Sequence, residues 1–241
     1  MPQPKKTVAI KSQAGHSASR VVALPGRTGN AIVQRSTRER LSDAMEALRE
    51  EKFQARRLEL AEAALETLGE LGYARTSLRE IAQNSEFTHG VFHYYFTDKL
   101  DLICCCVRHY KAKCVTRYDE VTASARTRDE LMDGFTAKLA ETLREEARMH
   151  RLWYDLRAQA LFEDAFRKDV AEIDKSLEDM MWRVASRYSE LGGKKPGVTS
   201  AVLYALFDGL FQRYLLKHLS NDRRAVPDLV DEVRRLLPTM C

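Results

Sequence analysis

Residues 56–103 read RRLELAEAALETLGELGYARTSLREIAQNSEFTHGVFHYYFTDKLDLI, and their pattern changes sharply at Gly72. Before Gly72, apolar residues recur at the spacing of one helix face. Glycine enters the left-handed conformation that ends a helix without steric cost, and Tyr73 can then fold back onto the helix. A helix is therefore expected to end at Gly72.

Capping signals divide the remainder of this segment into short helices. Ser77 and Glu80 have the spacing of a capping box, which opens a second helix. After a short break, Thr88 can cap a third helix, and Asp98 can cap a longer fourth one. Two short helices joined by a tight turn predict a helix-turn-helix between Ser77 and Tyr95.

The segment resembles the DNA-binding domain of the tetracycline-repressor family, strongly over about residues 55–102 and elsewhere only in helical pattern. The residues that carry the resemblance are Gly72-Tyr73, Thr76-Ser77, Ile81-Ala82, Gly90, and Phe96 with Lys99. It implies a homodimeric, all-α transcription factor, a repressor that a small-molecule effector releases from a palindromic double-stranded DNA operator. Asp208-Gly209-Leu210 further resembles the betaine-regulator branch.

The third short helix is the expected reading helix. A major groove about 12 Å wide admits one helix, whose exposed face must carry hydrogen-bonding or aromatic groups. By the resemblance, the residues that face bases or the groove wall are His89, Gly90, Val91 and His93, with Thr88 and Tyr94 nearer the phosphates. Ser77 and Lys99 are expected to clamp the DNA backbone, because helix N-termini attract anions.

Two departures from the family pattern affect this surface. Ser85 and Glu86 occupy the turn positions of a small residue and a glycine, and His93 replaces a common aromatic residue. Glu86 also places a negative charge near the DNA. His89 and His93 have the i, i+4 spacing of two zinc ligands, but the sequence offers no evident third ligand and no metal is expected. A merely structural helical bundle is the alternative.

The domain organisation follows from charge and periodicity. We expect a basic N-terminal arm over residues 1–35, a DNA-binding domain with a helical extension over residues 36–97, and a helical regulatory and dimerisation domain over residues 98–241. The arm can contact phosphates or serve as a solubilising tail, and an organelle transit peptide is a lesser alternative. The whole chain has 241 residues and a net charge of +4.

The C-terminal part predicts long amphipathic helices around an effector site. One apolar stripe contains Leu131, Phe135, Leu139 and Leu143, and another contains Phe166, Val170, Ile173, Leu177, Met180, Val184 and Tyr188. The residues Trp153, Tyr154 and Arg157 combine aromatic surface with a cation, as small-molecule pockets do. The alternative is a core helix whose arginine faces solvent.

A nearly all-apolar helix, Val198–Leu219, is expected to be either core or interface. We assign it to the dimer interface through Leu203, Phe207, Leu210, Phe211 and Tyr214. A further short amphipathic helix is expected around residues 229–237.

Other function classes receive less support. The sequence has no phosphate-binding glycine loop, nucleophile elbow or paired Cys-x-x-Cys set, so neither an enzyme nor a cofactor is expected, although a helical scaffold stays open. Cys104, Cys105 and Cys106 do not form a secreted disulfide pattern, which indicates a reducing cytoplasm. Cys105 with His109, near Cys106 and Cys114, could bind a soft metal or react with electrophiles, but buried structural thiols are the stronger interpretation. No apolar run is long enough to span a membrane.

Overall fold

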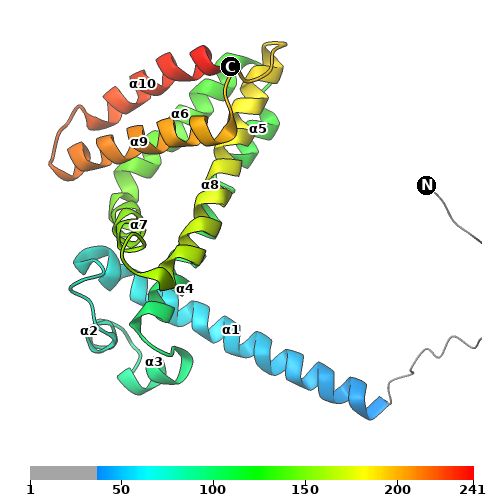
Figure 1. Cartoon of the computed structure of the whole chain (residues 1–241), viewed down its shortest axis with the longest axis vertical. Helices are drawn as coiled ribbons and strands as arrows, with labels where there is room; N and C mark the ends of the chain where they lie inside the picture. Colours follow the sequence, from blue (N-terminus) through cyan, green and yellow to red (C-terminus); the bar gives the residue numbers. More distant parts are fainter. Residues whose placement is uncertain (1–36) are drawn as a thin grey trace, which may run out of the picture. The chain divides into compact units, whose positions relative to one another are not determined.

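The computed structural model describes residues 37–241, and in that part every regular element is an α-helix (Figure 1). The described helices are α1 (Thr37–Leu71), α2 (Leu78–Gln83), α3 (His89–Tyr95), α4 (Lys99–Cys114), α5 (Asp119–Ser124), α6 (Arg128–Glu145), α7 (Ala147–Gln159), α8 (Asp164–Leu191), α9 (Ser200–Leu219) and α10 (Ala225–Met240). The all-α prediction is confirmed. The basic arm, residues 1–35, lies outside the described residues.

The helix-turn-helix and the C-terminal helices all belong to one compact unit, residues 44–241. Within residues 37–241, no helix has the length and apolar character needed to cross a membrane. The proposed boundary between DNA-binding and regulatory domains near residue 97 falls just before α4, at the cap residue Asp98.

Helix α1 is continuous through the charged run at residues 49–57 and extends to Leu71. The side chains of Leu60, Ala64 and Leu68 are fully buried there. Gly72 ends the helix as predicted, because its φ of 74° lies in the left-handed region that a side chain disfavours.

The capping signals set the boundaries of α2 and α4. Ser77 Oγ accepts a hydrogen bond from the Glu80 N–H at 3.2 Å, while the Ser77 N–H donates to the Glu80 carboxylate at 2.7 Å. The Asp98 carboxylate accepts from the Asp101 N–H at 2.9 Å. Thr88 holds the cap position of α3 but makes no side-chain capping bond. All three predicted helix starts are therefore correct.

The two predicted apolar stripes of the C-terminal part lie on α6 and α8, and all their members are buried. Helix α9 packs against α8 and α10, and α10 also packs against α6, as the orange, red and green ribbons of Figure 1 show. Helix α10 is longer than its apolar residues indicated. It tolerates Pro227 because the N–H groups of a first helical turn have no partner within the helix.

The expected dimer-interface residues need correction. Leu203, Phe207, Phe211 and Tyr214 are buried within their own chain, and Leu210 is half-buried. Helix α9 is apolar all round, so its sequence pattern does not show which face turns inward. The exposed apolar residues of α9 are Val202, Leu206, Leu216 and Leu219.

Candidate functional site

The reading helix α3 is fixed to the rest of the domain by buried aromatic rings and one arginine. Phe92 and Phe96 are buried in the core. The Arg57 guanidinium of α1 lies 4.6 Å from the Phe96 ring centre and donates to the Tyr95 carbonyl at 3.0 Å. It also pairs with the Asp101 carboxylate at 2.5 Å. These contacts join α1, α3 and α4 and give α3 one orientation.

The opposite face of α3 is open to solvent. Thr88, His89, His93 and Tyr94 are exposed, and Tyr94 keeps 73% of its surface accessible. A Cβ atom added at Gly90 would meet no atom within 4 Å, so the backbone there is free to approach another molecule. Val91 is half-buried and supports the helix from the side. Hydrogen-bonding groups thus gather on one accessible face, as groove reading requires.

His89 and His93 face each other on this surface. Their Nε2 atoms lie 3.1 Å apart and their rings meet edge to face. Within residues 37–241, the one cluster of three potential metal-ligand side chains lies elsewhere, so this pair has no third ligand. The two rings are consistent with a hydrogen-bonding face, in which either imidazole can donate or accept.

The turn between α2 and α3 forms without the glycine of the family pattern. Glu86 does not adopt a positive φ, because Asn221 is the only non-glycine residue that does so in the described part of the chain. Ser85 Oγ instead accepts from the Phe87 N–H at 3.3 Å, and the Phe87 ring packs against Phe92. A serine side chain therefore stabilises the turn, and Glu86 stays exposed.

Ser77 and Lys99 make internal contacts rather than facing outward freely. The Ser77 hydroxyl and N–H both take part in the capping box. Lys99 Nζ donates to the Tyr73 carbonyl at 2.6 Å, and desolvation lowers the pKa of this lysine. Arg75, just before α2, and Arg79, in its first turn, are exposed cations that the motif comparison overlooked. Their position close to the N-cap of α2 was the sequence signal that could have identified them.

Residues 60–103 match the family described as bacterial regulatory proteins, tetR family. This helix-turn-helix segment is of the tetR type. The matched residues are those of DNA-binding bacterial regulatory proteins. No protein with a curated description matches its sequence.

Solved structures of regulators share the fold of this chain. A TetR transcription regulator from Haloarcula marismortui is 16% identical with a TM-score of 0.63, over 77% of this chain and 98% of that one. The regulator FadR from Bacillus subtilis, crystallised with stearoyl-CoA, is 18% identical with a TM-score of 0.59, over 74% and 95%. The reduced form of NemR from E. coli is 16% identical with a TM-score of 0.61, over 75% and 96%.

A cavity of about 80 Å³ lies among the C-terminal helices of this regulator. Six helices contribute to it, and its apolar wall consists of Phe135, Leu139, Leu177, Met180, Met181, Phe207, Phe211, Leu229 and Val233. Phe207 and Phe211, which the sequence assigned to a dimer interface, therefore face this cavity.

Two of the three predicted pocket residues line the cavity. Trp153 and Tyr154 contribute to its wall, whereas Arg157 lies outside it. Arg157 forms ion pairs with Asp208 and, through Nε at 3.3 Å, with Asp174. The Tyr154 hydroxyl donates to the Asp208 carboxylate at 2.9 Å. Arg157 thus neutralises an aspartate at the cavity edge instead of facing solvent.

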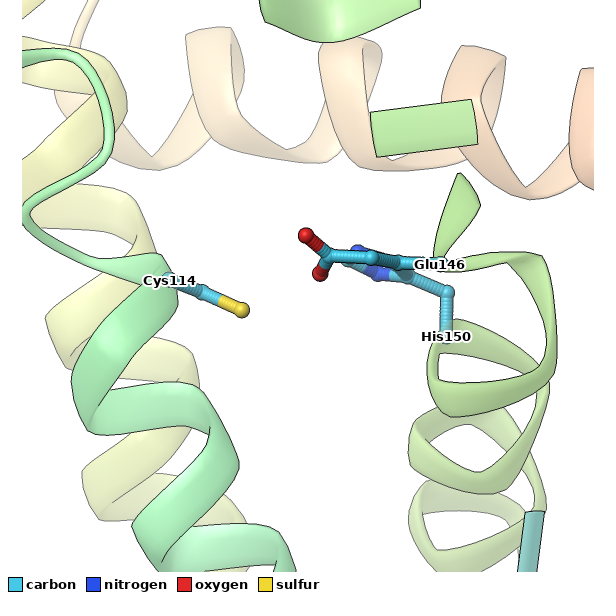
Figure 2. A group of neighbouring side chains, drawn as sticks. All are labelled: Cys114, Glu146 and His150. Carbon is cyan, nitrogen blue, oxygen red and sulfur yellow. The ribbon is translucent and has the colours of Figure 1, made fainter. Parts of the chain in front are cut away.

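Three potential metal-ligand side chains meet at the polar end of the cavity. Figure 2 shows the Cys114 thiol pointing across to Glu146 and His150. Their ligand atoms all lie within 4.8 Å of one another, and Cys114 and His150 are buried. Sequence reasoning considered Cys114 only with Cys105 and His109, because Glu146 and His150 lie on elements distant in sequence.

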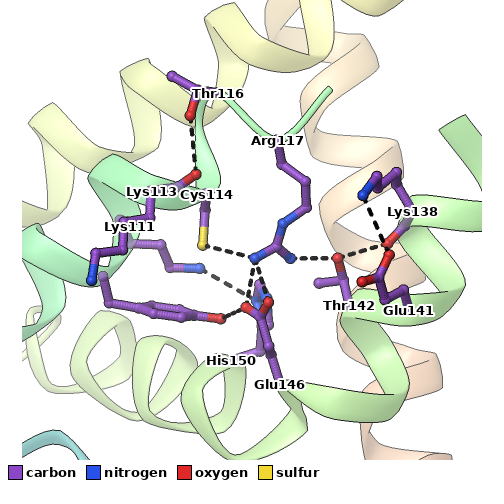
Figure 3. Close-up of polar contacts among 11 residues, drawn as sticks. Lys111, Lys113, Cys114, Thr116, Arg117, Lys138, Glu141, Thr142, Glu146 and His150 are labelled. Carbon is purple, nitrogen blue, oxygen red and sulfur yellow. Dashed lines mark hydrogen bonds and ion pairs between the residues drawn. The ribbon is translucent and has the colours of Figure 1, made fainter. Parts of the chain in front are cut away.

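The neighbours of this cluster oppose a bound cation. Arg117 donates to both Glu146 carboxylate oxygens at 2.6 Å, and the Tyr110 hydroxyl donates to the same group (Figure 3). Lys111 Nζ lies 3.3 Å from His150 Nδ1. A metal ion would displace these donors and meet two positive charges, which makes the cluster better suited to an anion.

The adjacent cysteines on α4 have the surroundings of structural thiols. Cys104 and Cys106 are buried, and Cys106 Sγ donates to the Ala61 carbonyl at 3.3 Å. Burial raises the pKa of all three thiols, including half-buried Cys105. A raised pKa disfavours the thiolate, which is the reactive and metal-binding form.

Proposed function

We propose that this regulator is a repressor that binds a palindromic operator as a homodimer and is released when a small molecule enters the C-terminal cavity. The observation that carries the proposal is that one helix, α7, contacts both the cavity and the segment that leads into the helix-turn-helix. The exposed face of α3 supplies the DNA-reading surface, and the cavity supplies a separate place for an effector.

Helix α7 has two functional faces. His150 and Trp153 line the cavity. Other residues of α7 contact the end of α1 and the segment that follows it. Arg151 Nη2 donates to the Glu70 carbonyl at 2.9 Å, and the Asp155 carboxylate accepts from the Tyr73 N–H at 2.8 Å. A ligand that displaces His150 or Trp153 would therefore move the end of α1 and the start of the reading head. FadR, which has this fold, was crystallised with stearoyl-CoA, and this supports a ligand-binding role.

The exposed face of α9 is the proposed homodimer surface. Val202, Leu206, half-buried Leu210 and Leu216 follow one another at helical spacing along that face. A second copy of the chain would cover this apolar face through the same residues, as two-fold symmetry requires. Two reading heads would then be available for two successive major grooves of a palindromic site.

The function is tested with DNA fragments selected from a random library by the pure protein. Fluorescence anisotropy on the selected duplex should show that His89→Ala and Tyr94→Ala each weaken specific binding by about 1 to 3 kcal/mol. His218→Ala, which changes a histidine at the far end of α9, is the matched control and should bind normally. If His89→Ala and Tyr94→Ala both bind the selected duplex as tightly as the wild-type protein, α3 is not the helix that reads the DNA.

A further inference from the structure

The polar end of the cavity has more hydrogen-bond donors than acceptors. The side chains of Lys111, His150 and Trp153 all line it and are almost entirely buried. Neither His150 Nε2 nor Trp153 Nε1 has a hydrogen-bond partner among the described residues. Buried polar groups are almost always paired, so unpaired groups at the wall of a cavity indicate what its ligand must offer.

The contact between Lys111 and His150 fixes the role of each nitrogen. A lysine ammonium can only donate, so His150 Nδ1 accepts from Lys111 Nζ at 3.3 Å. Burial, and then the nearby Lys111 and Arg117, keep the pKa of His150 well below its usual value. The neutral ring then carries its hydrogen on Nε2. The cavity therefore contains a histidine N–H, an indole N–H and an ammonium, all of which need acceptors.

One positive charge at the cavity remains without a carboxylate partner. Arg117 is paired with Glu146, and Asp208 is paired with Arg157. Within residues 37–241, the one hydrogen-bond contact of Lys111 Nζ is with neutral His150, and the rings of Tyr110 and Trp153 also lie near it. The carboxylates of Glu146 and Asp208 attract this lysine without forming an ion pair with it. A buried charge without a partner is costly, so a ligand that supplies one negative charge would be stabilised there.

We propose that the cavity binds a small monocarboxylate with a hydrophobic body, whose carboxylate accepts hydrogen bonds from Lys111, His150 and Trp153. An ionised carboxylate is an acceptor-only group with about four lone-pair sites, which matches the three donors Lys111, His150 and Trp153. The apolar wall, which is rich in phenylalanine, methionine and leucine side chains, matches the hydrophobic body of such a ligand. The binding of such a ligand does not depend on the proposed function. Only its effect on operator binding rests on that function.

Isothermal titration calorimetry on the full chain tests the ligand class with two carboxylates, phenylacetate and octanoate, and their neutral amides. The wild-type protein should bind at least one carboxylate at least tenfold more tightly than its amide. Lys111→Met keeps an apolar side chain of similar length and should abolish that preference. Lys113→Met, which removes an exposed lysine from the same helix, should retain it.

Retained amide binding by the Lys111→Met protein would demonstrate that its cavity is intact. Equal affinity for carboxylate and amide in the wild-type protein, or an unchanged preference in Lys111→Met, would overturn the proposal. Absence of binding by all four compounds would overturn it as well.

The effect of each compound on operator binding separates the two proposals. Carboxylate binding that leaves operator affinity unchanged supports the ligand class and contradicts effector release. Operator release by the amides as strongly as by the carboxylates supports effector release and overturns the ligand class.

Discussion

The reading head and the effector cavity are encoded in different ways. The head uses residues 77–99, whose caps and turn are local signals, and its exposed face follows directly from one short helix. The cavity uses residues from 111 to 233, which six helices bring together. A surface presented by one short element can be predicted from its motif, whereas a cavity depends on the packing of elements that are distant in sequence.

The largest expected effect separates the buried and exposed faces of α3. Phe92 is fully buried, so Phe92→Ala should lower the free energy of unfolding by about 3 to 5 kcal/mol. Tyr94→Ala removes a largely exposed ring. It should change the free energy of unfolding by less than about 0.5 kcal/mol while weakening DNA binding. Urea denaturation followed by circular dichroism measures both. Equal destabilisation by the two substitutions would contradict the assignment of the two faces.

The two faces of α9 provide the next contrast. Leu206→Glu places a charge on the exposed face and should weaken self-association at least a hundredfold without unfolding the chain. Phe207→Glu, one residue further on, buries a charge at the cavity wall and should unfold the chain. Sedimentation velocity distinguishes these outcomes, with Leu161→Glu at an exposed leucine outside α9 as the control. A Leu206→Glu protein that remains dimeric would exclude this surface.

A pH titration tests the buried lysine of the cavity. Burial lowers the pKa of Lys111 from 10.5 to about 8, so above pH 8 the folded chain binds fewer protons than the unfolded chain. The free energy of unfolding should therefore rise with pH, relative to Lys111→Met, with a slope approaching about 1.4 kcal/mol per pH unit between pH 8 and 10.5. The titratable or charged groups that surround this lysine are Cys114, Arg117, Glu146, His150 and Asp208.

Paired denaturation curves of the wild-type protein and Lys111→Met at each pH measure this difference. Because the surrounding groups are present in both proteins, their contributions largely cancel. If the difference in free energy of unfolding between the two proteins stays constant from pH 7 to 10.5, the pKa of Lys111 is not lowered by burial.

The smallest expected effect concerns the link between the two regions. Asp155→Asn weakens the charge-assisted hydrogen bond to the Tyr73 N–H and should reduce the coupling between ligand and operator by about 1 kcal/mol. Ligand affinity without DNA should be unchanged, because Asp155 does not line the cavity. Operator titrations at saturating ligand measure the coupling. If the ligand lowers the operator affinity of this variant as much as that of the wild-type protein, Asp155 does not transmit the coupling.

The sequence was most informative where a signal acts over a few residues. Gly72, Ser77 and Asp98 define helix ends through local geometry, and the amphipathic stripe of α8 shows which face is buried. Helix α9 has no such stripe, and four of its five predicted interface residues are buried within the chain, whereas Leu210 is half-buried. The role of Lys111 was not predictable, because a lysine on a helix is ordinarily solvated and only tertiary packing places it beside His150.

Reciprocal titration tests the central claim, that the cavity and the reading head are coupled, most directly. The affinity of the tightest-binding carboxylate is measured by calorimetry with the free protein and with its complex with the selected operator duplex. Coupling requires that the operator weaken ligand binding by the same factor by which the ligand weakens operator binding. We expect a hundredfold change in each direction, which corresponds to about 2.7 kcal/mol. Equal ligand affinity with and without operator would contradict the account.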